Sequence, residues 1–144
     1  MTLLLLIILS LNGVKLGITH TAYNDAHINA FCSNESTTQI LCEDTNDTIY
    51  GYRHVYSRAQ FDNDQLTRID YTFGNGINAA KDIEKKLVEQ FGPEFANTDL
   101  LPDSYFVYFQ RSQQQLELTF TAKHASINHP VIRLTLEVLK SDSE

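Results

Sequence analysis

The sequence predicts a single α+β domain, with an antiparallel sheet of about six strands and two helices on one face. Three observations support this class. The length of 144 residues is typical of one domain. Two helix-like segments each precede a group of short segments in which apolar and polar residues alternate, as half-buried antiparallel strands require. No Pro-rich or Ser-rich linker divides the chain, so the predicted order is α-β-β-β-α-β-β-β.

The chain begins with an apolar run over residues 3–9. This run is much shorter than the roughly 20 residues of a membrane-spanning helix, so no stable membrane span is expected. Its length matches the apolar core of a secretory signal peptide. We therefore expect a signal peptide over 1–13, cleaved after Gly13, and a mature domain over 14–144. The alternative is that the run forms a buried first strand or helix.

A short helix is predicted over 20–31, because Thr19 is a good N-cap and apolar positions follow it. The next segments are rich in β-forming residues. Each of them is predicted as a strand: 39–42, 48–52 and 54–61.

The Asp and Asn residues of segment 62–65 predict a tight hairpin turn. Residues 66–73 then alternate. Ile69, Tyr71 and Phe73 are expected to face the core, whereas Leu66 shares the opposite face with Arg68, Asp70 and Thr72. The region between the two helices is therefore predicted to hold three or four strands.

The strongest helix prediction covers 78–91, where Ile83, Leu87 and Phe91 recur at four-residue spacing. Gly92 and the following proline end it, since glycine suits the left-handed position after a helix and proline cannot continue one. Residues 94–103 are predicted as a loop. Three strands follow, at 105–109, 116–121 and 131–139. Their core faces are predicted to include Leu116, Leu118 and Phe120 and then Ile132, Leu134, Leu136 and Val138.

The two cysteines, Cys32 and Cys42, lie ten residues apart. An even cysteine count behind an export signal indicates a disulfide, which would contribute about 2–3 kcal/mol by closing a short loop. Free buried thiols are one alternative. A zinc site is the other, and it would need two more ligands, for which His27 and His54 are nearby in the sequence. The disulfide and the export signal together predict a periplasmic or secreted protein.

Charge and motifs exclude several functions. Asp and Glu number 18 against 11 Lys and Arg, a net charge of −7, whereas nucleic acids require a basic surface. The sequence contains no Gly-x-Ser-x-Gly, His-Glu-x-x-His, phosphate-binding glycine loop or Cys-x-x-Cys. We therefore expect no enzymatic activity, no cofactor and no metal ion.

Tyrosine and arginine gather in one segment of the predicted sheet. Both residue types are common at the centres of protein interfaces. This composition indicates an interaction face formed by Tyr50, Tyr52, Arg53, Tyr56 and Arg58. The alternative is that these tyrosines simply suit a half-buried sheet, with the ring inside and the hydroxyl in water.

Several short motifs occur in a familiar order. The sequence Leu-Gly-Ile-Thr at 16–19 precedes a predicted helix and then the two cysteines. A phenylalanine, an acidic turn and a leucine follow at 61–66, and the second helix ends in Phe-Gly-Pro at 91–93. Residues 16–93 thus resemble the β-lactamase inhibitor protein-like group and related small exported bacterial α+β proteins. The resemblance implies that fold and a protein-binding role, and it transfers no binding residue, because the matching positions are structural.

These observations favour an exported, non-enzymatic protein-binding module of the inhibitor or immunity type, with a protein partner. One alternative is a structural or assembly factor of the cell envelope. Another is a small hydrolase or metal-dependent enzyme, in which folding would bring together acidic residues and two of His54, His124 and His129.

Overall fold

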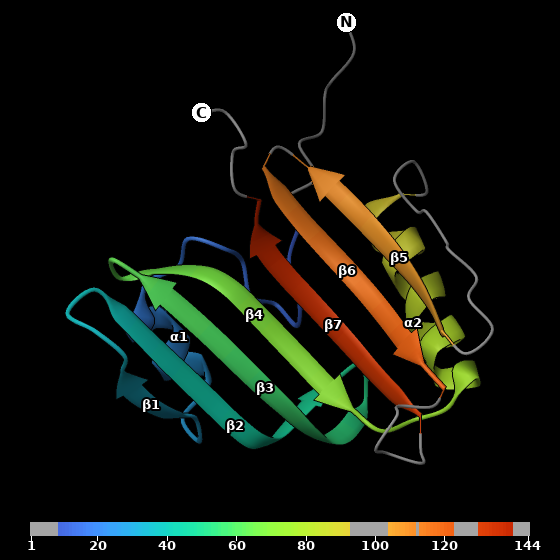
Figure 1. Ribbon diagram of the computed structural model, residues 1–144, viewed down its shortest axis with the longest axis horizontal. Helices are drawn as coiled ribbons and strands as arrows, with labels where there is room; N and C mark the ends of the chain where they lie inside the picture. Colours follow the sequence, from blue (N-terminus) through green and yellow to red (C-terminus); the bar gives the residue numbers. More distant parts are fainter. Residues whose placement is uncertain (1–8, 93–103, 112, 123–129, 140–144) are drawn as a thin grey trace, which may run out of the picture.

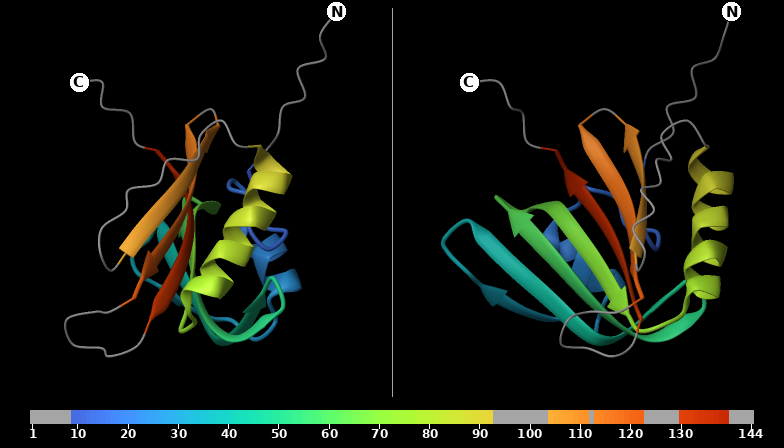
Figure 2. Two further views of the ribbon diagram at one scale, coloured as in Figure 1. Left: turned by 90° about the vertical axis from the view of Figure 1, so that its right-hand side faces the viewer. Right: turned by 45° about the vertical axis from the view of Figure 1, so that its right-hand side comes forward.

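A single curved sheet organises the molecule. The computed structural model describes residues 9–92, 104–111, 113–122 and 130–139. In these residues seven antiparallel strands pair in the order β1-β2-β3-β4-β7-β6-β5, and both helices lie on the same side of the sheet (Figures 1 and 2). The antiparallel α+β prediction is confirmed, whereas the predicted strand number and element order are wrong.

The observed element order places four strands, not three, before the second helix. In chain order the elements are α1 (His20–Ala26), β1 (Phe31–Asn34), β2 (Gln39–Ile49), β3 (Tyr52–Asp62), β4 (Gln65–Phe73), α2 (Ile77–Phe91), β5 (Ser104–Arg111), β6 (Gln114–Thr121) and β7 (Val131–Val138).

The unpredicted strand is β1. The helix expected over 20–31 ends at Ala26, and Phe31 instead begins a strand that pairs with β2. Cys32 and Cys42 lie directly opposite each other in this pairing and form a disulfide, as predicted. The segment expected to be a helix end and a loop therefore becomes the edge of the sheet.

The strand predicted over 48–52 is wrong, because the middle of this segment is a hairpin turn. Ile49 pairs with Tyr52, and the two residues between them, Tyr50 and Gly51, have φ angles of 51° and 83°. Two consecutive positive φ values are typical of the tight turn that best matches the twist of a hairpin. β2 consequently runs on through the acidic segment before Ile49.

The next turn confirms the prediction for 62–65, since Asn63 and Asp64 also have positive φ angles, of 51° and 63°. The predicted position of Leu66 is wrong. A register shift near the turn places Leu66 opposite Phe61, and both side chains are buried. A β-bulge moves side chains to the other face in this way. The three predicted core residues of β4, from Ile69 to Phe73, are buried.

The core lies between the sheet and the two helices. Ile83, Leu87 and Phe91 of α2 are buried as predicted, and Gly92 ends the helix with a φ of 86°. The ring of Phe91 lies 6.1 Å from that of Phe109 in β5.

The strands β6 and β7 complete this core. Their predicted core residues are buried at Leu116, Leu118, Phe120, Ile132, Leu134 and Leu136. Val138 is 42% exposed, so its predicted core position is wrong; it is the last residue of β7. The predicted loop at 94–103 lies outside the described residues.

The N-terminal segment contributes to the same core. Leu9 and Leu11 are completely buried, and Leu11 exchanges two backbone hydrogen bonds of 2.9 Å with Val14. The side-chain amide of Asn12 donates to the carbonyl of Thr48 at 2.8 Å. Leu9, the one residue of the apolar run among the described residues, is thus buried as the alternative requires, although residues 9–14 form only an isolated bridge and no strand or helix. The signal peptide remains a prediction, and residues 3–8 of the apolar run lie outside the described part of the chain.

Neither helix among the described residues is long and apolar enough to cross a membrane.

Candidate functional site

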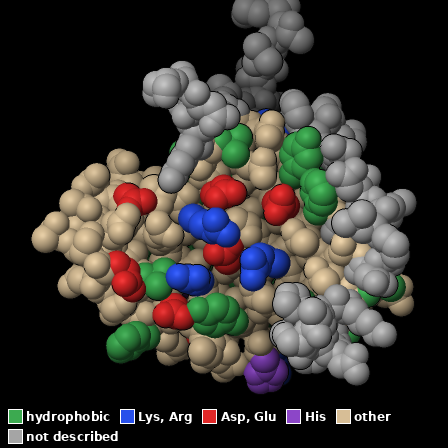
Figure 3. Space-filling view, viewed as in Figure 1, with side chains coloured by type: hydrophobic (Ala, Val, Ile, Leu, Met, Phe, Trp, Pro, Cys, Tyr) green, Lys and Arg blue, Asp and Glu red, His purple; other side chains and the backbone are tan. Residues whose placement is uncertain are grey.

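No helix or loop among the described residues covers the face of the sheet opposite the helices. On β4, β7 and β6, which are neighbours, the outward side chains alternate with the buried ones and are mostly Thr, Arg, Asp and Glu. Figure 3 views this face directly and shows Lys or Arg and Asp or Glu side chains interspersed at its centre. We call this surface the open face.

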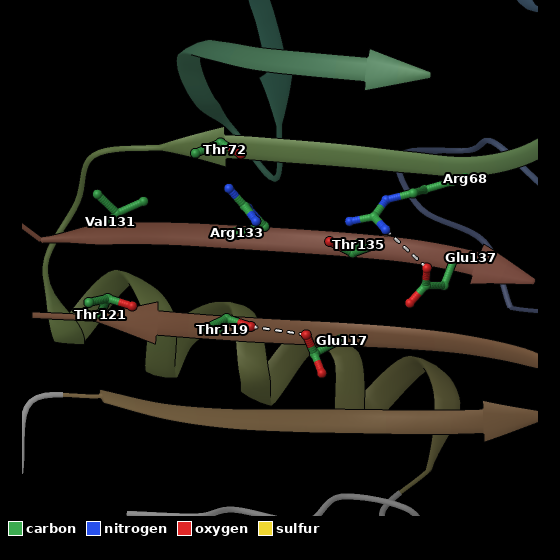
Figure 4. A pocket seen from close by; sticks show the side chains of 9 residues that line it. All are labelled: Arg68, Thr72, Glu117, Thr119, Thr121, Val131, Arg133, Thr135 and Glu137. Atoms are coloured by element: carbon green, nitrogen blue, oxygen red, sulfur yellow. Dashed lines mark hydrogen bonds and ion pairs between the residues drawn. The ribbon is translucent and has the colours of Figure 1, made fainter. Parts of the chain in front are cut away.

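A hollow of about 480 Å³ lies over these three strands (Figure 4). Its volume lies within the range of small-molecule pockets, roughly 300–1,000 Å³. The residues that line it are Arg68, Thr72, Glu117, Thr119, Thr121, Val131, Arg133, Thr135 and Glu137. We call this hollow the threonine pocket.

One end of the threonine pocket is held by a bonded network around Asp70. The carboxylate of Asp70 accepts hydrogen bonds from Nε and Nη2 of Arg68, at 3.1 and 3.2 Å, and from the hydroxyl of Thr135 at 2.6 Å. Nη1 of Arg68 also bonds Glu137 at 3.2 Å. The hydrogen bond to Asp70 raises the pKa of Arg68 above its ordinary value. Arg68 is therefore engaged by groups of the protein itself.

The other end of the threonine pocket contains an uncommitted cation. Arg133 is exposed and makes no ion pair or side-chain hydrogen bond with any described residue. Its direct cross-strand neighbours are Thr72 on β4 and Thr119 on β6. Figure 4 shows Arg133 beside Thr72, with no bond to any residue drawn, whereas Thr119 donates to Glu117 at 3.2 Å. This end of the pocket thus offers hydrogen-bond donors to an incoming group.

Two further hollows continue across the open face. One of about 260 Å³ shares Arg68 with the threonine pocket and is lined by Leu41, Arg58, Gln60, Arg68 and Asp70. The next, of about 290 Å³, shares Arg58 with the second and reaches β2 and the loop before it. These shared residues make the three hollows a continuous row from β6 to β2.

The predicted tyrosine and arginine group does not occupy one face. Tyr56 and Arg58 lie on the open face, where the Tyr56 hydroxyl donates to Glu43. That hydrogen bond raises the pKa of Tyr56.

The other predicted residues lie at the β2–β3 hairpin. Tyr52 stacks on buried Phe73 at 5.3 Å, and Nζ of Lys86 in α2 lies 5.9 Å from the ring centre of Tyr50. Both tyrosines therefore pack toward the helix-covered core. Arg53 is exposed at the same hairpin. Of the predicted group, only Tyr56 and Arg58 remain candidates for binding on the open face.

The histidines proposed as metal ligands lie apart. His27 stacks on Tyr23 at 4.1 Å, and Nδ1 of His54 lies 2.9 Å from the side-chain oxygen of Asn46. His20 is the histidine near the cysteines, with its ligand atoms within 4.8 Å of both sulfurs. Those sulfurs are bonded to each other and offer no thiolate to a metal.

The histidines considered for a hydrolase are only partly placed. His54 has the amide partner described above, while His124 and His129 lie outside the described residues. A grouping of two of them with a carboxylate stays a prediction.

A group of buried hydroxyls lies on the helix-covered face. Tyr23 of α1, Ser57 of β3 and Tyr71 of β4 are completely buried; the Tyr23 hydroxyl lies near that of Ser57, and the Tyr71 hydroxyl lies near the side chain of Asn12. Burial raises the pKa of Tyr23 to about 12 and raises that of Tyr71 further. These hydroxyls remain protonated at neutral pH and are neither charged nor nucleophilic there.

The threonine pocket was not identified as a site from the sequence. Its signal is present in the pattern, because β4, β6 and β7 each combine threonine with charged residues at the outward positions. Such residues are equally common on any solvent-facing strand. The pattern becomes specific only when the strand order is known.

Comparisons with protein-family models, with curated proteins and with solved structures give no match for this chain.

Proposed function

We propose that this protein is a non-enzymatic binding module, exported from the cytoplasm, that holds a protein partner against its open face. The observation that carries the proposal is the row of three hollows, in which Arg58 and Arg133 are free of ion pairs with described residues. Arginine at the centre of a hollowed surface is typical of residues that dominate binding energy.

The shape of the open face favours a protein over a small molecule as the main partner. The row of hollows extends across strands from β6 to β2, so a ligand that fills all three must be much larger than one pocket. Leu41, Tyr56 and Val131 add apolar surface between the charged groups. A mixture of apolar, aromatic and arginine side chains is common in protein interfaces.

The bonding on the open face favours recognition over catalysis. Asp70, whose side chain is only 14% exposed, already accepts three hydrogen bonds and serves to hold Arg68 and Thr135 in place. These three hydrogen bonds occupy both carboxylate oxygens, so Asp70 positions its neighbours and is not free to contact a reacting group. The network therefore gives the face a fixed shape, which lowers the entropy cost of binding.

Site-specific photo-crosslinking in the producing cells tests this proposal. A photoreactive residue is introduced at Thr119 or Gln60 on the open face, and at Lys85 or Glu89 on the exposed side of α2 as matched controls. We expect one discrete crosslinked protein from the open-face positions and none from the helix positions. Crosslinks of equal yield from both sides, or none from the open face, would show that this face does not hold the partner.

A further inference from the structure

We infer that the threonine pocket binds a carboxylate side chain, Asp or Glu, presented by the partner protein at Arg133. This inference rests on the proposed function, because it names the chemistry recognised on the same face. The protein has a net charge of −7, so a free cation in a hollow is a local exception to its overall charge.

The charges of the threonine pocket favour one negative group. Arg68 is already shared between Asp70 and Glu137, whereas Arg133 has no bonded counter-charge in the part of the chain that the structure describes. The remaining acid, Glu117, accepts a hydrogen bond from Thr119 and points away from Arg133 (Figure 4). A single carboxylate would therefore neutralise Arg133, which among the described lining residues is the cation without a counter-charge. A doubly charged phosphate would bring one negative charge more than Arg133 can neutralise, and Glu117 would repel it more strongly than it repels a carboxylate.

The geometry of the donors fits a carboxylate. A guanidinium presents paired N–H groups that match the two oxygens of a carboxylate. Thr72 lies directly across from Arg133 on β4, and Thr121 lines the same end of the pocket from β6. Neither of these two threonine hydroxyls has a hydrogen bond to another described residue. The threonine methyl groups and Val131 supply apolar contact for the methylene groups of an Asp or Glu side chain.

Binding of small model ligands tests the inference separately from the crosslinking experiment. The probes are N-acetyl-glutamate-amide, its neutral isostere N-acetyl-glutamine-amide, and sodium acetate as a free carboxylate. Binding is followed by two-dimensional ¹H–¹⁵N NMR of the intact oxidised protein. We expect the glutamate probe to shift the amide signals of Thr72 and Thr119 saturably, the glutamine probe to leave them in place, and acetate to bind more weakly than the glutamate probe.

Two arginine variants locate the site. Arg133→Gln should weaken the glutamate probe by about tenfold, because it removes the charge-assisted pair. Arg58→Gln, a matched change in the second hollow, should leave the affinity within about twofold. The unchanged NMR spectrum outside the pocket checks that both variants are folded.

Every other outcome of these binding experiments refutes a specific part of the inference. No saturable shift, equal shifts with both amide probes, or loss of binding in Arg58→Gln alone refutes a carboxylate site at Arg133. Acetate that binds as tightly as the glutamate probe assigns the pocket to a free small carboxylate. Crosslinking from Thr119 without glutamate binding leaves the proposed function intact and removes only this inference.

Discussion

Shortening Leu11 to alanine tests whether the N-terminal segment is part of the core. The side chain of Leu11 is completely buried, and its backbone is fixed by the two hydrogen bonds to Val14. Replacing a buried leucine with alanine in a packed core costs about 2–5 kcal/mol. That cost is a large share of the roughly 5–15 kcal/mol that stabilises a domain.

Urea denaturation of the oxidised protein measures this cost. With a denaturant slope of about 2 kcal/mol/M, Leu11→Ala should lower the unfolding midpoint by about 1–2.5 M. Ile28→Ala is the control, because this apolar side chain is 84% exposed and its loss should change stability by less than about 0.5 kcal/mol.

Equal midpoints for Leu11→Ala and wild type refute the core assignment of Leu11. The result also bears on the predicted signal peptide, since cleavage after Gly13 would remove both Leu9 and Leu11 from the mature domain. A chain that begins at Val14 and unfolds at the wild-type midpoint would agree with cleavage. The intact mass of the exported protein tests cleavage independently. A mass equal to that of the full-length chain would refute the signal-peptide prediction.

Three other predictions concern stability. Cys32→Ser should destabilise the oxidised protein by about 2–3 kcal/mol and leave the fully reduced protein unchanged, and an equal loss in both conditions contradicts a stabilising disulfide. Leu87→Ala should cost about 2–5 kcal/mol in the same urea assay, whereas exposed Lys85→Ala should cost less than about 0.5 kcal/mol. Because burial raises the pKa of Tyr23 from 10.0 to about 12, its contribution to stability is full below pH 10.0 and is lost as pH rises through about 12. Tyr23→Phe should flatten that fall, and parallel pH curves for variant and wild type contradict the reasoning.

Local sequence signals were sufficient where one residue type determines the backbone. The turn at Asn63 and Asp64 and the helix end at Gly92 were predicted, because Asn, Asp and Gly adopt positive φ angles at low cost. The turn at Tyr50 and Gly51 was missed because β-forming residues surround it, and tyrosine rarely adopts a φ of 51°. In that hairpin the pairing of two long strands outweighs the local preference.

Long-range pairing explains the errors that remained. β1 becomes a strand because the disulfide partners Cys32 and Cys42 face each other across a ladder, and the local sequence of Phe31–Asn34 gives little sign of this. Leu66 reaches the core through a register shift, which depends on how β3 and β4 pair. Simple alternation counts residues along one strand and does not detect such a shift.

The threonine pocket depends on the least local pairing of all, that of β4 with β7. This pairing brings Asp70 beside Thr135, which is 65 residues away along the chain. It also brings Arg68 beside Glu137, which is 69 residues away. The same register places Thr72 beside Arg133. The pairing of β4 with β7 therefore determines the positions of both the bonded network around Asp70 and Arg133. On its other face this ladder aligns buried core residues of the two strands. A slip of one residue between β4 and β7 would expose that core, so the hydrophobic face fixes the register on which the binding face relies.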